Sequence, residues 1–370
     1  MKNVLIIEAQ MKQYRAAFYA GLYERFRRVG ARLTVAYSDA PPLEAHKRDA
    51  CELPLDYGLK VKGYWLWPEK LVYQPLLRTA LASDLVIVDQ ENKLLLNHFL
   101  LPLSRLGAQR IAFWGHGENR AKDANRFSEW YRRKTLNWVS WWFAYTSGTA
   151  DYLQRQGVQG SKITVVLNSI DTKRLQERVR SFRANDKAAL RAKHAIPPQA
   201  SIGIFVGALH KVKSLTLLLE ASQQIRKAIP DFHLLLVGGG PEEEQIKKRA
   251  AEHSWIHLVG PKFEEAKAEF LAIAHLFLLP GAVGLAILDS FAAGLPLITT
   301  TVPIHGPEME YLEDGRNGII TAHDPETYAR TVVRLLSHPE ELLRLSEGAR
   351  RSAEKYSIEA MVENFAEGIL

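Results

Sequence analysis

Three turns in the second half of the chain combine glycine with residues that could bind an anion. Gly207 ends an apolar run and is followed six residues later by Lys213, while Gly238–Pro241 and Pro280–Leu285 end two further apolar runs. Glycine lets backbone N–H groups approach a ligand closely, and a helix N-terminus and an ammonium group both favour phosphate. Taken alone, the first turn is better explained as an ordinary turn with a surface lysine, and the second as a tight connection between a strand and a helix that has Pro241 at its first position.

Two other side chains are suited to a polar ligand. Asp289 follows the third turn by about one helical turn, where its carboxylate could accept hydrogen bonds from ribose hydroxyls. His116 lies between two glycines directly after an apolar run, and an imidazole changes its charge near neutral pH. The alternative for His116 is that it satisfies the polar groups of its own turn.

Short apolar runs alternate with longer helical patterns, and this alternation predicts parallel sheets with crossover helices. The first half has six candidate strands: Val4–Ile7, Leu33–Tyr37, Leu85–Val88, Arg110–Trp114, Trp141–Thr146 and Thr164–Leu167. The second half has five: Ser201–Val206, His233–Val237, His257–Val259, Leu276–Leu279 and Leu297–Thr300. Ligands of such sheets bind beyond the carboxyl ends of the strands, which is where the glycine turns lie.

The composition is that of a globular protein and limits the kinds of site. The chain has 370 residues, 47% of them hydrophobic, and a net charge of +7, so it can bury enough apolar surface to fold. Its single cysteine, Cys51, excludes an intramolecular disulfide framework and any site of several cysteines. Because no apolar stretch approaches the roughly 20 residues that span a bilayer, we expect a cytoplasmic protein.

The order of the three turns resembles the C-terminal half of the retaining glycosyltransferase family 4, which has the GT-B fold. FVGALHKVKSLTLLLEA resembles the strand, glycine and lysine segment of that family, and HLLLVGGGPEEEQI its glycine–proline loop. LFLLPGAVGLAILDSFAAGLPLITT resembles its donor-site strand and helix, and HGPEMEYLEDGRNGII the segment that follows. In the first half, Gln13-Tyr14-Arg15, WFAYTSGTADYL and VVLNSID are similar to family segments more loosely.

The resemblance implies an α/β protein of GT-B architecture, in which two Rossmann-like domains with parallel sheets face each other across a cleft. The expected divisions are an N-terminal acceptor-side domain over residues 1–170 and a linker over 171–200, where eight Lys and Arg accumulate between 172 and 194. We then expect a nucleotide-sugar-binding domain over 201–352. The last expected segment is a C-terminal helix over 353–370 that returns to the first domain.

The resemblance also assigns roles residue by residue. Lys213 would contact the donor phosphates, Asp289 the ribose, and His116 the donor sugar; these three are the expected catalytic residues. The expected nucleotide-sugar contacts are Gly207, Lys213, Gly239, Gly281, Val283, Gly284, Leu285 and Asp289. Weaker candidates for the cleft wall are Tyr14, Arg15, Asn168 and Glu308.

Two positions depart from the family pattern. Many members carry an arginine where this chain has Ala208, so one cation is missing, and Arg15, Arg120 or His210 could replace it. Many also carry a pair of glutamates at the positions of Gly281 and Asp289, the first of which holds hydroxyls of the donor sugar.

The expected activity is retaining transfer of a sugar from a nucleotide-diphosphate sugar to an acceptor hydroxyl, in bacterial cell-surface polysaccharide or lipid-linked glycan synthesis. No cofactor and no metal are expected, since Asp-x-Asp and paired histidine ligands are absent from the sequence. The alternatives are a nucleotide-sugar epimerase of the same fold and an inactive protein that binds a nucleotide sugar or a partner.

A basic, aromatic stretch follows His116. Residues 104–134 hold eight Lys and Arg against three Asp and Glu, and six aromatic residues at helical spacing follow: Phe127, Trp130, Tyr131, Trp138, Trp141 and Trp142. Residues 120–143 would suit the anionic inner face of the plasma membrane as well as a helix packed on the core. The sequence contains no zinc finger and no RRM motif, so we do not expect nucleic-acid binding.

Overall fold

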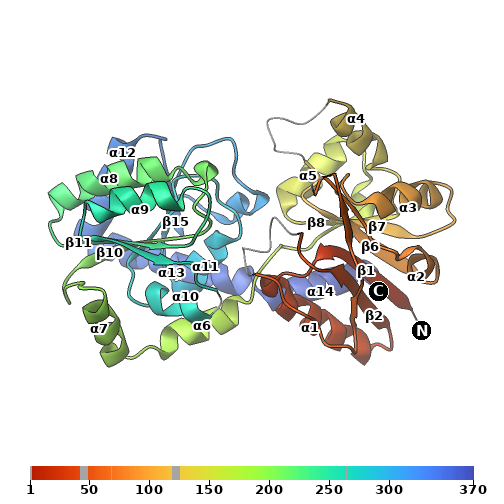
Figure 1. Cartoon of the computed structure of the whole chain (residues 1–370), viewed down its shortest axis with the longest axis horizontal. Coiled ribbons are helices and arrows are strands. Elements are labelled where there is room, and N and C mark those ends of the chain that lie inside the picture. The colour runs from red at the N-terminus through yellow and green to blue at the C-terminus, as the bar shows by residue number, and fades with distance from the viewer. Residues whose placement is uncertain (1, 42–48, 68, 119–125, 264) are drawn as a thin grey trace. The chain divides into compact units, whose positions relative to one another are not determined.

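The computed structural model describes residues 2–41, 49–67, 69–118, 126–263 and 265–370. The chain divides into two compact units (Figure 1). Unit 1 contains Met1–Ile170 and Ile358–Leu370, and unit 2 contains Asp171–Ser357. Residues 171–200, which the sequence assigns to a linker, form helices α6 (Thr172–Ser181) and α7 (Ala184–Lys193) of unit 2.

Unit 1 is built on a parallel sheet whose seven described strands run in the order β3-β2-β1-β6-β7-β8-β9. The strands are β1 (Asn3–Gln10), β2 (Arg32–Ser38), β3 (Gly58–Lys60), β6 (Leu85–Asp89), β7 (Ile111–Gly115), β8 (Trp141–Ala144) and β9 (Ile163–Val165). The helices are α1 (Gln13–Arg28), α2 (Leu77–Leu81), α3 (Leu95–Arg105), α4 (Arg126–Thr135), α5 (Ser147–Arg155) and α14 (Ile358–Ile369). A small antiparallel hairpin, β4 (Tyr64–Leu66) and β5 (Leu71–Tyr73), lies outside this sheet.

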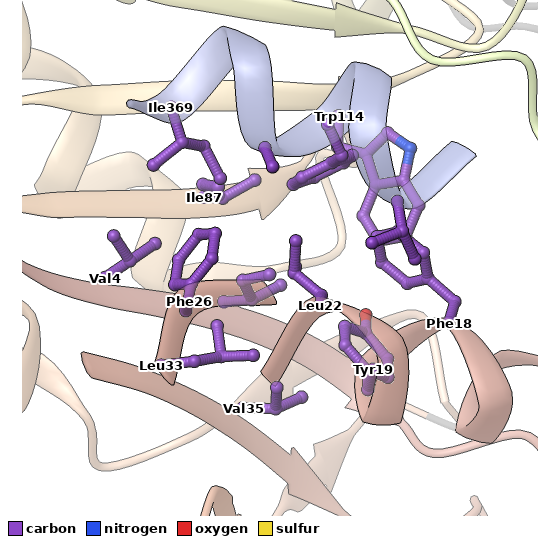
Figure 2. Close-up of a cluster of buried hydrophobic side chains, with 14 of the residues drawn as sticks. Val4, Phe18, Tyr19, Leu22, Phe26, Leu33, Val35, Ile87, Trp114 and Ile369 are labelled. Carbon is purple, nitrogen blue, oxygen red and sulfur yellow. The ribbon is translucent and has the colours of Figure 1, made fainter. Parts of the chain in front are cut away.

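The first core of unit 1 lies between the sheet and helices α1 and α14. Side chains from both helices and from the central strands converge there, including Phe18, Trp114 and Ile369 (Figure 2). Phe365 of α14 stacks on Phe143 with a ring separation of 4.2 Å and also meets Trp114 and Phe18 at 5.0 and 5.1 Å. A second core on the other face of the sheet contains residues from α2, α3 and α5.

Unit 2 repeats the plan with six described strands in the order β12-β11-β10-β13-β14-β15. These are β10 (Ser201–Val206), β11 (Phe232–Val237), β12 (Ile256–Gly260), β13 (Leu276–Leu278), β14 (Leu297–Thr300) and β15 (Gly318–Thr321). Helices α8 (Leu215–Ala228), α9 (Glu243–Ala251) and α12 (Pro325–Ser337) cover one face (Figure 1). The other face carries α10 (Glu265–Leu271), α11 (Ala286–Ala293) and α13 (Pro339–Lys355).

Strand order explains where the glycine turns of unit 2 lie. Strands β10 and β13 are neighbours, although β11 and β12 separate them in the sequence, so the crossover direction reverses between them. In parallel α/β sheets this reversal opens space beyond the carboxyl ends of the two strands. Gly207 follows β10 and Gly281 follows β13, which brings the first and third turns to the same edge.

The aromatic face expected after His116 does not form on one helix. Helix α4 ends at Thr135, whereas Trp141 and Trp142 belong to strand β8, where Trp142 is fully buried. The strand predicted over Trp141–Thr146 is confirmed as β8, and the helical interpretation of the same residues was wrong. A buried parallel strand is apolar on both faces, so its sequence does not alternate and can be mistaken for a helix. Trp130 remains exposed on α4, while residues 120–125 and the side chain of Phe127 lie outside the described residues.

Candidate functional site

Lys213 and Gly281 meet at the edge where the strand order reverses. The Lys213 ammonium donates a 2.5 Å hydrogen bond to the carbonyl oxygen of Ala282, and the Ala282 N–H donates to the carbonyl oxygen of Val212 at 2.8 Å. The two loops are therefore bonded in both directions. This pairing fixes the ammonium beside the turn that precedes α11.

Gly281 has no room for a side chain. A Cβ placed there would lie 2.3 Å from the Lys213 carbonyl carbon and 2.4 Å from the Val212 carbonyl oxygen, both backbone atoms. The position at which many family members carry a glutamate is thus occupied by the lysine loop itself. The backbone of Val212 and Lys213 lies so close to residue 281 that no carboxylate side chain fits there.

The turns after β10, β11 and β12 are also joined through their backbones. The Leu209 N–H donates to the Gly239 carbonyl at 2.9 Å, and the Gly238 N–H donates to the Gly260 carbonyl at 3.0 Å. The Gly207 N–H donates to the Val237 carbonyl oxygen at 3.0 Å. These bonds hold the first two glycine turns together at the carboxyl ends of their strands, as the sequence predicts for Gly207 and Gly239.

His305 holds the third turn from the other side. Its Nδ1 accepts the Val283 N–H at 3.0 Å, and its Nε2 lies 2.8 Å from the Thr300 carbonyl. Val283 was expected to offer its N–H to a diphosphate, but that N–H is paired with His305. Gly284 and Leu285 precede the first residue of α11, so their N–H groups have no acceptor within the helix and remain the backbone donors of this turn.

Glu308 and Lys213 set the charge at this turn. Glu308 is buried, with 5% of its surface exposed, in the short 3-10 helix η4 (Pro307–Tyr311). Burial lowers the pKa of the Lys213 ammonium, and the negative charge of Glu308 opposes that shift. An ammonium in such surroundings gains more from a nearby anion than one in water does, because the local dielectric is lower.

Asp289 lies in α11 and is already paired. Its Oδ1 accepts a 2.6 Å hydrogen bond from the Lys267 ammonium of α10, and Asp289 is 6% exposed. A carboxylate has about four acceptor sites, so this pairing leaves capacity for hydroxyl groups. Lys267 was not identified from the sequence, since it precedes Asp289 by 22 residues in an unremarkable charged helix.

Arg15 of unit 1 is part of a buried network. Its guanidinium donates to the Tyr145 hydroxyl at 2.9 Å, lies 3.5 Å from Asn168 Oδ1, and pairs with Glu8 at 3.7 Å. Its Cζ atom stacks 3.9 Å above the Trp114 ring. Arg15 is 7% exposed, so its positive charge is used inside unit 1 and the idea that it replaces the cation missing at Ala208 loses support.

The carboxyl ends of β1 and β6 add two acids to this network. The Tyr19 hydroxyl donates to Glu8, and Asp89 ends β6. Burial raises the pKa of Asp89 well above its usual range, and the charge of Glu8 adds to that rise. Burial likewise raises the pKa of Glu8, although Arg15 acts against it.

The other candidates of unit 1 lie around the same network. His116 follows β7, is exposed, and meets the Tyr145 ring edge-on at 6.1 Å. Tyr14 is 36% exposed, with the Arg15 guanidinium 5.3 Å from its ring centre. His116, Tyr14, Arg15 and Asn168 are thus linked through Tyr145 and Arg15, a partner set that the sequence did not reveal. Arg120, the second candidate replacement cation, lies outside the described residues.

Comparison with known proteins places both units in one family. The sequence model described as Glycosyltransferase Family 4 matches residues 18–174, and the model described as Glycosyl transferases group 1 matches residues 200–338. The chain belongs to glycosyltransferase family 4. The expected family is confirmed, and so is the GT-B fold, on the two parallel sheets and on the solved structures below.

Curated relatives of this family 4 protein match over part of their length. A D-inositol 3-phosphate glycosyltransferase of Streptomyces bingchenggensis is 28% identical over 230 residues, which cover 58% of this chain and 49% of that protein. The D-inositol 3-phosphate glycosyltransferase 2 of Catenulispora acidiphila is 25% identical over 223 residues, 56% of this chain and 50% of that protein. The chain thus spans about half the length of the curated relatives it matches.

Solved structures match along the whole family 4 chain at low identity. Anabaena Alr3699/HepE, in complex with UDP, superposes with a TM-score of 0.75 and 14% identity and covers 100% of this chain and 99% of its own. Sucrose-phosphate synthase from Thermosynechococcus elongatus gives a TM-score of 0.74 at 16% identity, covering 99% and 98%. At such identities the match establishes the GT-B fold.

The described residues contain neither a membrane-spanning helix nor a cluster of metal ligands. Across those residues, no helix combines the length and apolar character that crossing a bilayer requires. Nor do the described His, Cys, Asp and Glu side chains form a group of three that could hold a metal ion. The expectation that no metal or cofactor takes part stays a prediction.

Proposed function

We propose that this protein transfers a sugar, with retention and without a metal, from a nucleoside diphosphate sugar to an acceptor hydroxyl. The observation that carries the proposal is the position of the Lys213 ammonium. It donates a hydrogen bond to the Ala282 carbonyl oxygen, in the turn whose Gly284 and Leu285 N–H groups directly precede helix α11. Cleavage of the glycosidic bond leaves negative charge on the diphosphate. A fixed cation and oriented N–H dipoles at that point would stabilise the charge as it develops.

The other residues take supporting roles in this proposal. Asp289, oriented by Lys267, accepts hydrogen bonds from the ribose hydroxyls, and the backbone near Gly207 and Gly239 lines the nucleotide side. His116 contacts the donor sugar, as the resemblance to the family implies. Because the Lys213 loop fills the space at Gly281, the donor sugar lacks the carboxylate contact that many family members provide.

Nucleotide binding is the first test. Thermal shift of the full chain is measured with UDP, GDP, ADP, CMP and dTDP at about 1 mM in EDTA, and a ligand at 100 times its Kd adds about 2.7 kcal/mol of stability. UDP is the leading candidate, since the Anabaena protein was solved with it. Lys213→Ala should abolish the shift, whereas Lys211→Ala, an exposed neighbour, should preserve it.

Product analysis then separates the reactions that share this donor site. Incubation with the sugar nucleotide should release free nucleotide only as an acceptor is consumed, and NMR of the new anomeric proton should show retention. A new sugar nucleotide formed without acceptor would indicate an epimerase instead. Binding with no turnover under any acceptor would indicate a nucleotide-sugar-binding protein and would contradict the proposed transfer.

We further propose a setting in cell-surface polysaccharide or lipid-linked glycan synthesis at the cytoplasmic face of the plasma membrane. The hairpin β4–β5 exposes Tyr64, Leu66, Trp67 and Tyr73, and the Lys62 ammonium lies 5.1 Å from the centre of the Tyr64 ring. Exposed aromatic residues beside lysine suit the headgroup region of an anionic bilayer.

Sedimentation with vesicles tests this setting. The protein should sediment with phosphatidylglycerol vesicles more than with phosphatidylcholine vesicles, and Leu66→Ser/Trp67→Ser should reduce that binding. Leu343→Ser, which changes an exposed leucine of unit 2, is the control. Equal sedimentation of the hairpin variant and the parent protein would contradict a role of the hairpin in membrane binding.

A further inference from the structure

A basic groove lies on unit 2 between helix α13 and the turn that precedes β15. It has a volume of about 480 Å³ and is lined by Glu313, Arg316, Asn317, Arg344, Gly348, Arg351, Ser352 and Lys355. None of these residues belongs to the donor turns described above. Of these eight residues, four are cationic and one carries a carboxylate.

The helix side of the groove is a single face. Arg344, Gly348, Arg351 and Lys355 are spaced four, three and four residues apart, so they lie one above another on α13. Gly348 lets the opposite wall touch this helix, because a Cβ there would lie 1.9 Å from the carbonyl oxygen of Arg316. The two walls are therefore in backbone contact at the floor of the groove.

The floor is held by polar groups that satisfy one another. The Asn317 amide donates to Ser352 Oγ and to the Tyr311 carbonyl, both at 2.9 Å, and its Oδ1 accepts the Glu313 N–H at 2.8 Å. Ser352 Oγ donates to the Gly348 carbonyl at 3.0 Å. Because this floor is closed and rigid, the shape of the groove does not depend on a bound ligand.

The cations differ in how far they are engaged. Arg344 donates to the Gly315 carbonyl at 2.7 Å, and Arg316 pairs with Glu313 at 2.8 Å on the exposed rim. Within the described residues Arg351 makes no ion pair, although it is exposed on the wall of the groove. The single carboxylate, Glu313, balances one cation, so an excess of positive charge faces the groove.

From this arrangement we infer that the groove is a second ligand site, which takes a small soluble molecule carrying two or more phosphate groups. Its volume falls within the roughly 300–1,000 Å³ of small-molecule sites. Guanidinium groups match phosphate oxygens in pairs, and several cations on two facing walls favour a multiply charged anion over a single carboxylate. The lining contains no large apolar side chain, which argues against an acyl chain or an aromatic ligand.

The site is separate from the donor turn and does not rest on the proposed transferase function. The test therefore uses the full chain carrying Lys213→Ala, so that the donor turn is disabled in every sample. Isothermal titration with inorganic pyrophosphate and with tripolyphosphate is performed at 50 and 300 mM NaCl. We expect binding that weakens at the higher salt, because exposed charges are screened.

Two matched variants locate the binding. Arg316→Gln/Arg351→Gln removes two groove cations but keeps the Arg344 contact to Gly315, and should weaken pyrophosphate binding at least tenfold. Arg330→Gln/Arg334→Gln removes two exposed cations of α12 that do not line the groove. This variant should leave the affinity for pyrophosphate unchanged within about twofold, because distant exposed charges are screened. Both variants should unfold at the same denaturant concentration as the parent.

Three outcomes would overturn the inference. One is no heat of binding with either phosphate at 50 mM NaCl, and another is equal weakening by the two double variants. The third is binding to phosphatidylglycerol vesicles that needs Arg316 and Arg351 while soluble phosphates fail to bind, which would assign the groove to a lipid headgroup.

Discussion

The two units share one plan of strands and helices but use charge in opposite ways. In unit 1, Arg15, Glu8 and Tyr19 are buried together, and the guanidinium is stacked on Trp114. In unit 2, Lys213 stands at a turn, bonded to a backbone carbonyl next to open helix N–H groups. A buried network is costly to interrupt, whereas a cation held by one carbonyl can be lost with little effect on folding. The same plan of strands and helices thus holds a buried, paired charge in one unit and a charge at a turn in the other.

The strongest test of this difference is Arg15→Met. It leaves Glu8 and Asp89 without their cation, and removing one partner of a buried pair costs about 3–5 kcal/mol. Urea unfolding measures the loss. Arg27→Met, which breaks an exposed pair with Glu24, should cost under about 1 kcal/mol. A cost below about 1 kcal/mol for Arg15→Met would show that the network is not structural.

Gly281→Ala tests how closely the lysine loop fits its turn. The added methyl would meet the backbone of residues 212 and 213, and such overpacking costs about 1–3 kcal/mol. Because Lys213 would have to move, the shift with UDP should also fall. Gly284→Ala meets nothing within 4 Å and should change the free energy of unfolding by less than about 0.5 kcal/mol. Equal stabilities of the two variants would contradict the described packing.

Lys213→Met should separate binding from folding. Burial already lowers the pKa of this ammonium, so the folded state gains little from the charge, and unfolding should change by less than about 1 kcal/mol in either direction. Stabilisation by nucleotide should nevertheless disappear. A loss of stability as large as that of Arg15→Met would mean that the two cations are equivalent, and the comparison would fail.

The smallest effect is a difference in response to acid. Burial, with the charges of His233 and His194, lowers the pKa of His257 to about 4, from 6.5. Between pH 4 and 6.5 the unfolded chain therefore binds more protons than the folded one. The contribution of His257 to the free energy of unfolding of unit 2 is complete above pH 6.5 and is lost as the pH falls towards 4. The pKa of Asp89 is raised, so its contribution to the free energy of unfolding of unit 1 depends on pH in the opposite direction. This contribution is present at acid pH and declines as the pH rises.

Hydrogen exchange of peptides from β6 and β11 can follow each unit separately. Between pH 7 and 4.5 the protection of β11 should fall relative to that of β6, after correction for intrinsic exchange. His257→Asn should make the protection of β11 less dependent on pH, and Asp89→Asn should do the same for the protection of β6. Parallel responses in the two units would argue against these assignments.

Local sequence predicted much of the fold because strands and turns are local. The runs ending at Gly207, Gly239 and Gly281 predicted three strand-to-helix turns, and the structure places them at one edge of a parallel sheet. Strands β3, β4, β5 and β15, each of three or four residues, were missed, whereas the equally short β9 and β13 were predicted. Trp141 and Trp142 were predicted both as the start of a strand and as part of an aromatic helical face, because six aromatic residues happen to fall at helical spacing; the structure confirms the strand.

The side-chain partners could not be predicted in the same way. Arg15 bonds to Tyr145 and Asn168, which lie 130 and 153 residues away, and Lys213 bonds to a carbonyl 69 residues away. No local pattern records which distant groups will meet. The filled space at Gly281 is similar: the sequence shows that a glutamate is missing, but the backbone of residues 212 and 213 explains why no side chain fits there.

The return of α14 to unit 1 has a consequence for the order in which the protein forms during synthesis. Phe365 and its neighbours complete a core whose other side chains lie before residue 170. The first 170 residues therefore leave the ribosome with that core uncovered, while unit 2 is continuous and can close as soon as it emerges. The segment made first is finished last, and until residues 358–369 arrive the apolar face that α14 covers stays exposed.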